Sequence, residues 1–397
     1  MKERQSNFEL LRILLMCTIP VFHLMVYNGV YYVDNSNALW ALVLTVGGAI
    51  PADYAFIALS AYFWLEREDE IRFRGVGGVR GFLAQPVIKK FIYLAVLVGT
   101  LYIVKVATLR GLFGYNNQEY FIDFFLMKGA WWYIYPYMVM SLIYPFLNKI
   151  IKMSSYIVIH IITMALSVIF IYNGLINRTS FIRDLLAFIF IYFFMGLLRR
   201  KKYSYFCGVA TTKGFMVTLS VLIYLTMLVV SVAIKMACIY FCSLNGHFEE
   251  VGMGTQSIFD CLRDLQNINI TDATSKGVIN FVIGRYHLLS AIMGLAVFFF
   301  FRDIKLKYNP LINKYAKTTI YIFLLHDTWM GVFWFFGICW NDYGYYPIWS
   351  FFGWMIIYVG SAFALAPVLA WIYNHTVKKL ATFVIEGLLG EARVEKC

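Results

Sequence analysis

The sequence predicts an all-α integral membrane protein with about ten transmembrane helices, and three observations support this. Of its 397 residues, 61% are hydrophobic and only 14% are charged, which is more apolar surface than one soluble core needs. Apolar runs of about 17–25 residues, the length that crosses a bilayer as a helix, recur along the chain. Basic residues gather in alternate connections between these runs.

The predicted spans follow one another with short polar segments between them, and no repeat or linker divides the chain. We therefore expect residues 1–397 to form a single transmembrane domain. In the fourth run, Gly129 separates a short surface helix from the span proper, which begins at Trp131. The runs lie near residues 9–29, 38–65, 86–106, 121–147, 156–172, 181–198, 215–242, 277–301, 316–338 and 348–373.

The distribution of positive charge predicts the orientation. An N-terminus in the cytoplasm brings most of the 34 lysines and arginines to that side, so both termini should be cytoplasmic in an inner or plasma membrane. The outer loops then hold only a few basic residues, Lys105 and Arg110 among them. The net charge of +12 thus reflects membrane topology, and no basic, aromatic-rich surface predicts binding to nucleic acid.

The first span carries ionisable residues on one helical face. Arg12 and His23 are eleven residues apart, or about three turns and 16 Å, and Glu9 precedes Arg12 by one turn. Glu9 can therefore pair with Arg12. Arg12 could simply extend to the membrane surface, but a histidine side chain is too short to do so. Because ionisable residues inside a span usually face a polar cavity, this face predicts the wall of a polar passage.

Several stretches in order resemble the acyltransferase-3 family of bacterial membrane proteins. Arg-x10-His in "NFELLRILLMCTIPVFHLM" (7–25), preceded by Glu9, is the first. The others are "ADYAFIALSAYF" (52–63), "WWYIYPYMVMSLIYPFLNKI" (131–150), "YFFMGLLRRKK" (192–202) and the segment from Tyr286 to "FLLHDTW" (323–329). The chain departs from the family pattern at Ser60-Ala61, where the family has Ser-Gly, and lacks its third-helix Arg-x-x-Arg.

The resemblance implies transfer of an acyl group, most often acetyl, from cytoplasmic acyl-CoA to a hydroxyl of a surface polysaccharide or lipid-linked sugar. Acetyl-CoA or another acyl-CoA would be the donor substrate, with no permanently bound cofactor or metal. The partners would be the lipid bilayer and polysaccharide-assembly machinery. Histidine suits removal of a hydroxyl proton near neutral pH, so His23 is the expected base, with Arg12 and Glu9 on the donor side.

The remaining candidates are assigned from charge and predicted depth. Lys89, Lys90 and Arg80, the nearest basic positions to the missing arginines, are expected to bind the donor phosphates. The resemblance implies that Asp53 and Ser60 line the site, and together with predicted depth it implies the same for His326. Trp132 is a further candidate for stacking on a sugar, and predicted depth adds Arg285 and His287.

Two other function classes fit an apolar chain with intramembrane charge. A transporter would carry polar residues at the midplane, but it predicts inverted halves with broken helices, which the sequence does not display. The third class is a non-catalytic membrane sensor or assembly partner of the same fold. Only the enzyme would consume an acyl-CoA thioester.

Overall fold

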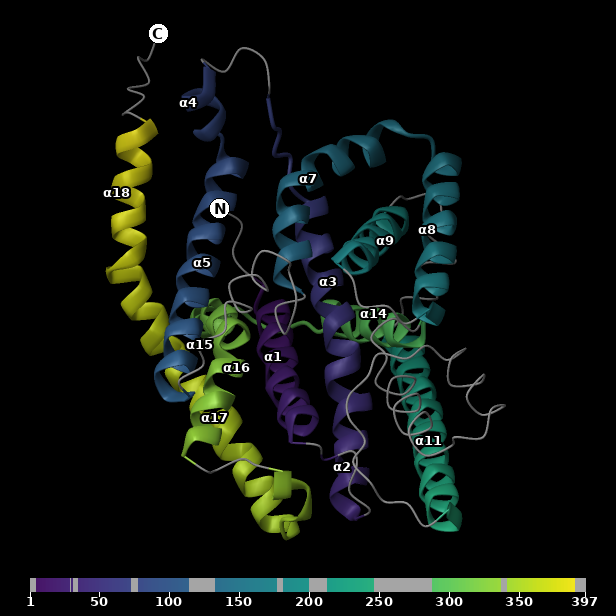
Figure 1. Cartoon of the computed structure of the whole chain (residues 1–397). Coiled ribbons are helices and arrows are strands. Elements are labelled where there is room, and N and C mark those ends of the chain that lie inside the picture. The colour runs from purple at the N-terminus through teal and green to yellow at the C-terminus, as the bar shows by residue number, and fades with distance from the viewer. Residues whose placement is uncertain are drawn as a thin grey trace.

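The computed structural model describes residues 5–28, 30, 35–72, 78–113, 133–176, 181–199, 213–245, 288–336 and 341–389. Nearly all of these residues are helical and none of them forms a strand (Figure 1). The predicted all-α class is therefore confirmed for the described part of the chain.

The helices coincide with the predicted apolar runs. In chain order the main ones are α1 (Ser6–Tyr27), α2 (Ser36–Leu44), the π-helical η2 (Thr45–Ala49), α3 (Ile50–Leu65), α5 (Pro86–Phe113), α7 (Ile134–Met153), α8 (Tyr156–Ile176), α9 (Phe181–Arg199), α11 (Lys213–Asn245), α14 (Leu288–Arg302), α16 (Thr319–Phe335) and α17 (Ile348–His375). Three shorter helices were not predicted: α4 (Gly78–Leu83), α15 (Pro310–Tyr315) and α18 (Val377–Leu389). The predicted run 316–338 begins with a 3-10 turn, η4 (Ala316–Thr318). A further 3-10 turn, η5 (Asn341–Tyr345), precedes α17.

Within the described residues, four helical stretches are long and apolar enough to cross a membrane, which indicates a membrane protein. They cover Ser6–Val26, Ser36–Leu65, Pro86–Leu112 and Ile348–Gly387. Shorter apolar helices lie at Tyr156–Tyr172, Val217–Val230 and Leu289–Arg302. Ten spans and cytoplasmic termini stay predictions.

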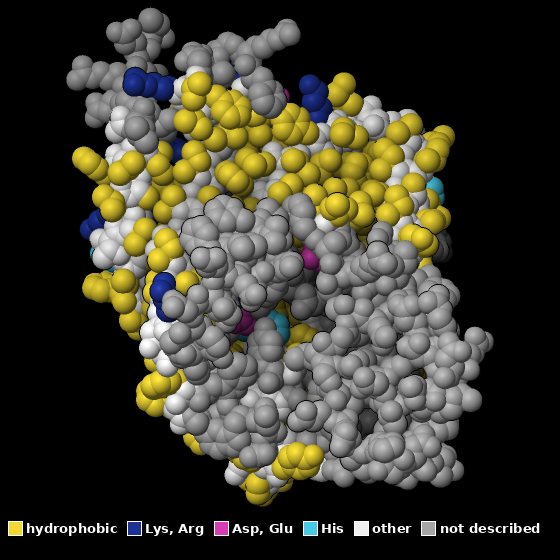
Figure 2. All heavy atoms as spheres, in the orientation of Figure 1, with side chains coloured by type: hydrophobic (Ala, Val, Ile, Leu, Met, Phe, Trp, Pro, Cys, Tyr) yellow, Lys and Arg dark blue, Asp and Glu magenta, His cyan; other side chains and the backbone are white. Residues whose placement is uncertain are grey.

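The outer surface of the helices is strongly apolar. Figure 2 shows hydrophobic side chains across much of the described surface on one face. Ile103 on α5, Ile157 on α8 and Ile356 on α17 are each more than 65% exposed. Apolar surface on this scale is typical of helices that face lipid.

Helix α1 lies in the middle of the molecule, in contact with α3, α14, α16 and α17 (Figure 1). Its first turn is fastened to the last turn of α14 and to α15. The Ser6 hydroxyl donates to Asn313 Oδ1 at 3.2 Å, and the Asn7 amide donates to the Phe301 carbonyl at 2.9 Å. Buried polar groups are stable only when they are hydrogen-bonded in this way, so these contacts hold the helix at a defined height.

The opposite end of the assembly is fastened by two asparagines. Asn35 caps α2 by accepting from the amide of Asn37, and both side chains donate to the Gly344 carbonyl at 2.9 Å. Asn37 also donates to the Tyr346 carbonyl at 2.7 Å. The start of α2 and the η5 turn before α17 are thereby joined.

Helix α14 crosses α3 at a point where only glycine fits. A Cβ added to Gly294 would lie 2.5 Å from the Cβ of Tyr54, 2.7 Å from the Pro51 carbonyl oxygen and 2.8 Å from the Ala55 nitrogen. Small residues allow helix backbones to approach closely in membranes. This crossing supports α3, which carries two of the candidate site residues.

A hydrogen-bonded network holds the C-terminal end of α3. Asn148 on α7 donates to the carbonyls of Trp64 and Arg67 at 2.9 and 3.2 Å. The side-chain oxygen Oδ1 of Asn148 accepts a hydrogen bond from the Tyr192 hydroxyl at 2.6 Å. Trp64 stacks on Tyr144 with ring centroids 5.7 Å apart. The network satisfies carbonyls that the end of a helix leaves without partners, and it positions Arg67.

Candidate active site

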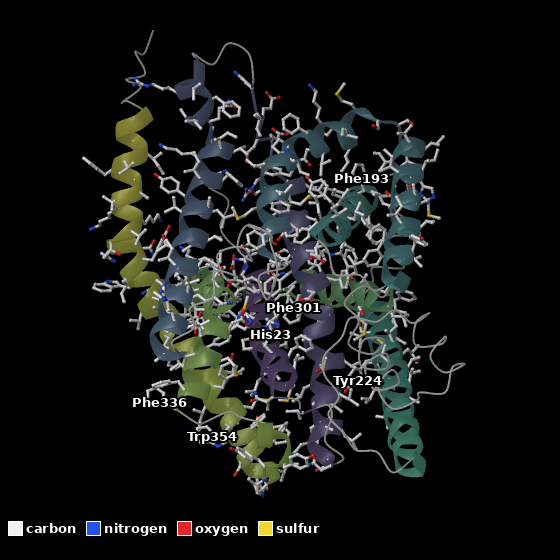
Figure 3. The ribbon with its side chains drawn as sticks, viewed as in Figure 1. His23, Phe193, Tyr224, Phe301, Phe336 and Trp354 are labelled. Atoms are coloured by element: carbon white, nitrogen blue, oxygen red, sulfur yellow. The ribbon has the colours of Figure 1, made fainter. Side chains whose placement is uncertain are left out.

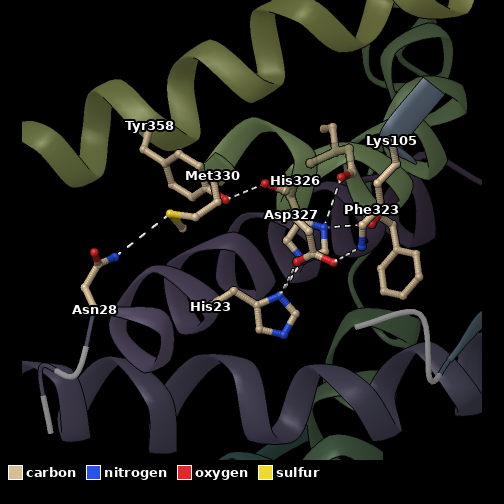
Figure 4. A network of polar contacts seen from close by, with 9 residues as sticks. His23, Asn28, Lys105, Phe323, His326, Asp327, Met330 and Tyr358 are labelled. Carbon is tan, nitrogen blue, oxygen red and sulfur yellow. Dashed lines mark hydrogen bonds and ion pairs between the residues drawn. The ribbon is translucent and has the colours of Figure 1, made fainter. Parts of the chain in front are cut away.

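Two buried histidines from distant helices face each other in the interior. His23 on α1 and His326 on α16 are 4% and 1% exposed, and their rings stack with centroids 4.6 Å apart and planes 13° from parallel. Nδ1 of His23 hydrogen-bonds with Nε2 of His326 (Figure 4). Figure 3 shows His23 near the centre of the helical assembly.

The surroundings of His326 assign the protons of this pair. Its Nδ1 lies 2.7 Å from the Phe323 carbonyl oxygen, which can only accept, so Nδ1 carries the proton. In the neutral ring Nε2 is then the acceptor, and Nδ1 of His23 is the donor to it. Nε2 of His23 consequently holds a lone pair and is the nitrogen that can take up a proton. The Tyr358 hydroxyl, which donates to the His326 carbonyl at 2.9 Å, fixes this turn of α16.

Asp327 and Lys105 complete the polar cluster (Figure 4). Oδ1 of Asp327 lies 3.1 Å from Nε2 of His326 and 3.4 Å from Nδ1 of His23. It makes no aligned hydrogen bond within the described residues. Oδ2 lies 3.2 Å from Nζ of Lys105 on α5. A carboxylate in this place stabilises the positive charge that develops when the histidine pair takes up a proton.

His23, His326 and Asp327 could also be metal ligands, since their ligand atoms lie within 4.8 Å of one another. Two imidazoles and a carboxylate would suit zinc. The ammonium of Lys105 already neutralises the carboxylate, however, and its positive charge disfavours a second cation beside it. The cluster therefore fits a hydrogen-bonded proton relay better than a metal centre.

A cavity of about 460 Å³ lies near the histidine pair, beside α1, α3, α5, α7 and α16. One face of α1 forms a wall, through Arg12, Met16 and Ile19. Ile19 and Phe323 line the cavity and precede His23 and His326 by about one helical turn. Of the predicted polar face of Glu9, Arg12 and His23, only Arg12 lines this cavity, and the rest of the wall on α1 is apolar.

Positive side chains line this cavity. They are Arg12, Arg67, Lys90 and Lys317. Arg12 donates to Glu9 at 2.7 Å, as predicted, and is 26% exposed while Glu9 is buried. Such a cluster, with planar guanidinium groups among its members, is suited to bind phosphate groups.

One carboxylate outside the helices moderates the positive charge. Asp69, which follows α3, accepts hydrogen bonds from the Tyr144 hydroxyl and from Lys90, the latter at 3.5 Å. Burial raises the pKa of Asp69, but the hydrogen bond from Tyr144 and the charges of Lys90 and Arg67 outweigh burial and lower the pKa below its usual range. Asp69 is thus ionised near neutral pH and holds Lys90 at the cavity mouth.

Ser60 and Asp53 contribute polar groups from α3. Both line the cavity, and the Ser60 hydroxyl lies 3.1 Å from the Tyr133 hydroxyl at the start of α7. Tyr133 also donates to the Phe56 carbonyl at 3.4 Å. These groups offer hydrogen-bonding positions between the cationic end and the histidine pair.

The structure brings some predicted site residues together and separates others. Arg12, Asp53, Ser60 and Lys90 line one cavity, and His326 contacts His23. Lys89 instead points to α18, where its Nζ lies 3.8 Å from Glu386, and Arg80 lies exposed on α4. The donor-binding prediction is therefore unsupported for those two residues. Trp132, Arg285 and His287 lie outside the described residues.

Four residues of the site were not predicted as site residues: Arg67, Lys105, Lys317 and Asp327. Lys105 was assigned to an outer loop, which is wrong, because α5 continues to Phe113 and the side chain is only 18% exposed. A lysine persists inside this helix because Asp327 compensates its charge. The sequence offered one signal for this pairing, the acidic residue directly after His326.

Comparisons with known proteins return no match, since neither protein-family models, nor curated proteins, nor solved structures resemble the chain significantly.

Proposed function

We propose that the protein is a membrane O-acyltransferase that moves an acyl group, acetyl foremost, from cytoplasmic acyl-CoA to a hydroxyl of a surface or exported polysaccharide or glycolipid. The observation that supports this best is the buried histidine pair, which lies about one helical turn beyond two lining residues of a cavity that also carries four cationic side chains. A base close to a cationic cavity matches the two requirements of this reaction, which are removal of the hydroxyl proton and binding of the donor phosphates.

The base step follows from the tautomers assigned above. Nε2 of His23 takes the proton of the acceptor hydroxyl, and the oxygen attacks the thioester carbonyl. The carbon–sulfur bond then breaks, and the proton passes from His23 to the departing sulfur. Asp327 stabilises the imidazolium between these two events.

The donor would bind along the wall of α1. Arg12, Arg67 and Lys90 provide positive charge for the CoA phosphates. The narrow pantetheine arm would then follow Met16 and Ile19 inward, over the roughly 16 Å that separate Arg12 from His23 along the helix axis.

The decisive experiment measures acyl transfer from labelled acetyl-CoA, together with the ester content of surface polysaccharide by mass spectrometry. We expect His23→Gln to lose on the order of 10²–10⁴-fold in rate while the protein still binds acyl-CoA. Arg12→Ala should lose donor binding, and Arg12→Lys should restore only part of it, because charge returns without the planar fork.

His160→Gln is the matched control, because His160 lies on α8, outside the cavity and the histidine cluster. It should retain the wild-type rate. A metal chelator should also leave the rate unchanged. If the cluster instead held a catalytic metal, the chelator would abolish activity. A folded His23→Gln protein acting at the full rate would refute the assignment of the base, and membranes that consume no acyl-CoA would favour a transporter or sensor.

A further inference from the structure

A second and larger cavity, of about 1060 Å³, lies between α5, α15, α16 and α17. Its wall is mostly apolar, with contributions from Leu97, Leu311, Ile320, Pro367 and Ala370. It adjoins the first cavity, since Leu94, Lys317 and Ile320 line both. Leu311 and Trp371 at its edge are 75% and 62% exposed, so the groove opens to the exterior of the helices.

A proline in α17 explains how the groove is built. Pro367 has no amide hydrogen, so the Phe363 carbonyl one turn earlier lacks its helical donor. The Tyr315 hydroxyl donates to that carbonyl at 2.5 Å, and the rings of Tyr315 and Phe363 stack 6.0 Å apart. This contact fixes the end of α15 against α17. The groove is therefore a structured feature with a satisfied wall.

Three lysines at this groove have no acidic partner among the described residues. Lys314, Lys317 and Lys378 line it and are exposed, and none of them forms an ion pair with a described residue. Other lysines behave differently: Lys89, Lys90, Lys105 and Lys152 each have a carboxylate within 4.0 Å. An apolar groove with uncompensated positive charge is complementary to a ligand with an apolar body and an anionic head.

We propose that this groove binds an anionic phospholipid of the surrounding bilayer, with its phosphate at Lys314, Lys317 and Lys378 and its acyl chains along the apolar wall. Basic pockets between transmembrane helices bind anionic lipid head groups in this way. The cavity volume, about 1060 Å³, lies just above the usual range of roughly 300–1,000 Å³ for small-molecule pockets, which leaves room for a ligand with long chains. The proposal does not depend on the acyl transfer proposed above.

The test uses the full-length protein, purified and stripped of lipid, and native mass spectrometry with phosphatidylglycerol or phosphatidylcholine of identical chains. Wild type should prefer phosphatidylglycerol. Each lysine near the head group contributes about fivefold, so Lys314→Gln/Lys317→Gln/Lys378→Gln should weaken phosphatidylglycerol binding on the order of 10²-fold. Binding of phosphatidylcholine should be nearly unchanged in that variant.

Two further variants separate the groove from general charge effects. Lys305→Gln/Lys307→Gln/Lys379→Gln removes the same charge from exposed lysines that do not line the groove, and it should keep the wild-type preference. Asn374→Trp fills the groove from an exposed lining position and should weaken binding of both lipids. Equal affinity of wild type for the two lipids, wild-type binding by the triple groove variant, or displacement of phosphatidylglycerol by glycerol phosphate alone would overturn the proposal.

Discussion

Replacing Gly294 with alanine should separate α14 from α3. The added methyl carbon would approach three atoms of α3 to 2.5–2.8 Å, and two of them, the Pro51 oxygen and the Ala55 nitrogen, belong to the backbone. Backbone atoms cannot rotate away, so one helix must retreat by roughly 0.5–1 Å to restore ordinary contacts. Overpacking of this kind costs about 1–3 kcal/mol, and we expect the upper end of that range here.

The matched control is Gly99→Ala, because a Cβ at Gly99 on α5 meets nothing within 4 Å. Alanine favours a helix over glycine by about 1 kcal/mol, so Gly99→Ala should raise stability slightly. The same gain offsets part of the cost at Gly294, which leaves a net loss of about 2 kcal/mol. Thermal unfolding of the purified proteins in one detergent should place Gly294→Ala several degrees below wild type and Gly99→Ala at or above it. Equal midpoints for the two variants would refute the close crossing.

Two further predictions concern ion pairs, and a third concerns membrane topology. Lys105→Met should destabilise the protein by about 3 kcal/mol, because the buried Asp327 carboxylate then lacks the Lys105 ammonium that neutralises it. Adding Asp327→Asn to the same protein should restore part of the lost stability, as measured by thermal unfolding. Asp69→Asn should lower the temperature of unfolding at neutral pH, because folding lowers the pKa of Asp69 and the ionised carboxylate therefore stabilises the folded state. This stabilisation is fully present above the unfolded pKa of about 3.9 and is lost as the pH falls through the folded pKa. The unfolding temperatures of wild type and variant should therefore converge in acid. A reporter that works only in the cytoplasm should be active when it is fused after Cys397. Activity of a reporter that works only outside the cytoplasm, fused at the same place, would contradict the predicted topology.

The helices were predictable because lipid imposes a simple rule on sequence. A chain that crosses hydrocarbon must satisfy its own backbone, so long apolar runs become helices. Each of the ten predicted runs overlaps a helix in the described residues, although only the later parts of 121–147 and 277–301 are described. Periodicity also predicted correctly that Glu9 and Arg12 pair and that Arg12 faces a cavity. Within one helix, geometry follows directly from spacing.

Contacts between helices were much less predictable. Lys89 and Lys90 are adjacent and chemically identical, yet only Lys90 lines the cavity, because successive residues of a helix point about 100° apart and packing decides which faces inward. Lys105 resembled a loop residue because its partner Asp327 is 222 positions away. The second histidine of the pair was predicted as a lining residue, but its contact with His23 depends on how α1 and α16 pack.

The central position of α1 has a consequence for the order in which the protein is made. Its polar residues find their partners very late in the chain: His23 and His326 are separated by 303 positions, Ser6 and Asn313 by 307, and Asn7 and Phe301 by 294. At ribosomal rates of about 5–20 residues per second, roughly 15–60 s pass between synthesis of α1 and of these partners. During that interval these polar side chains of α1 do not yet have the hydrogen-bond partners that they have in the folded protein. Biogenesis therefore requires either that the insertion machinery solvates them or that α1 enters the bilayer late.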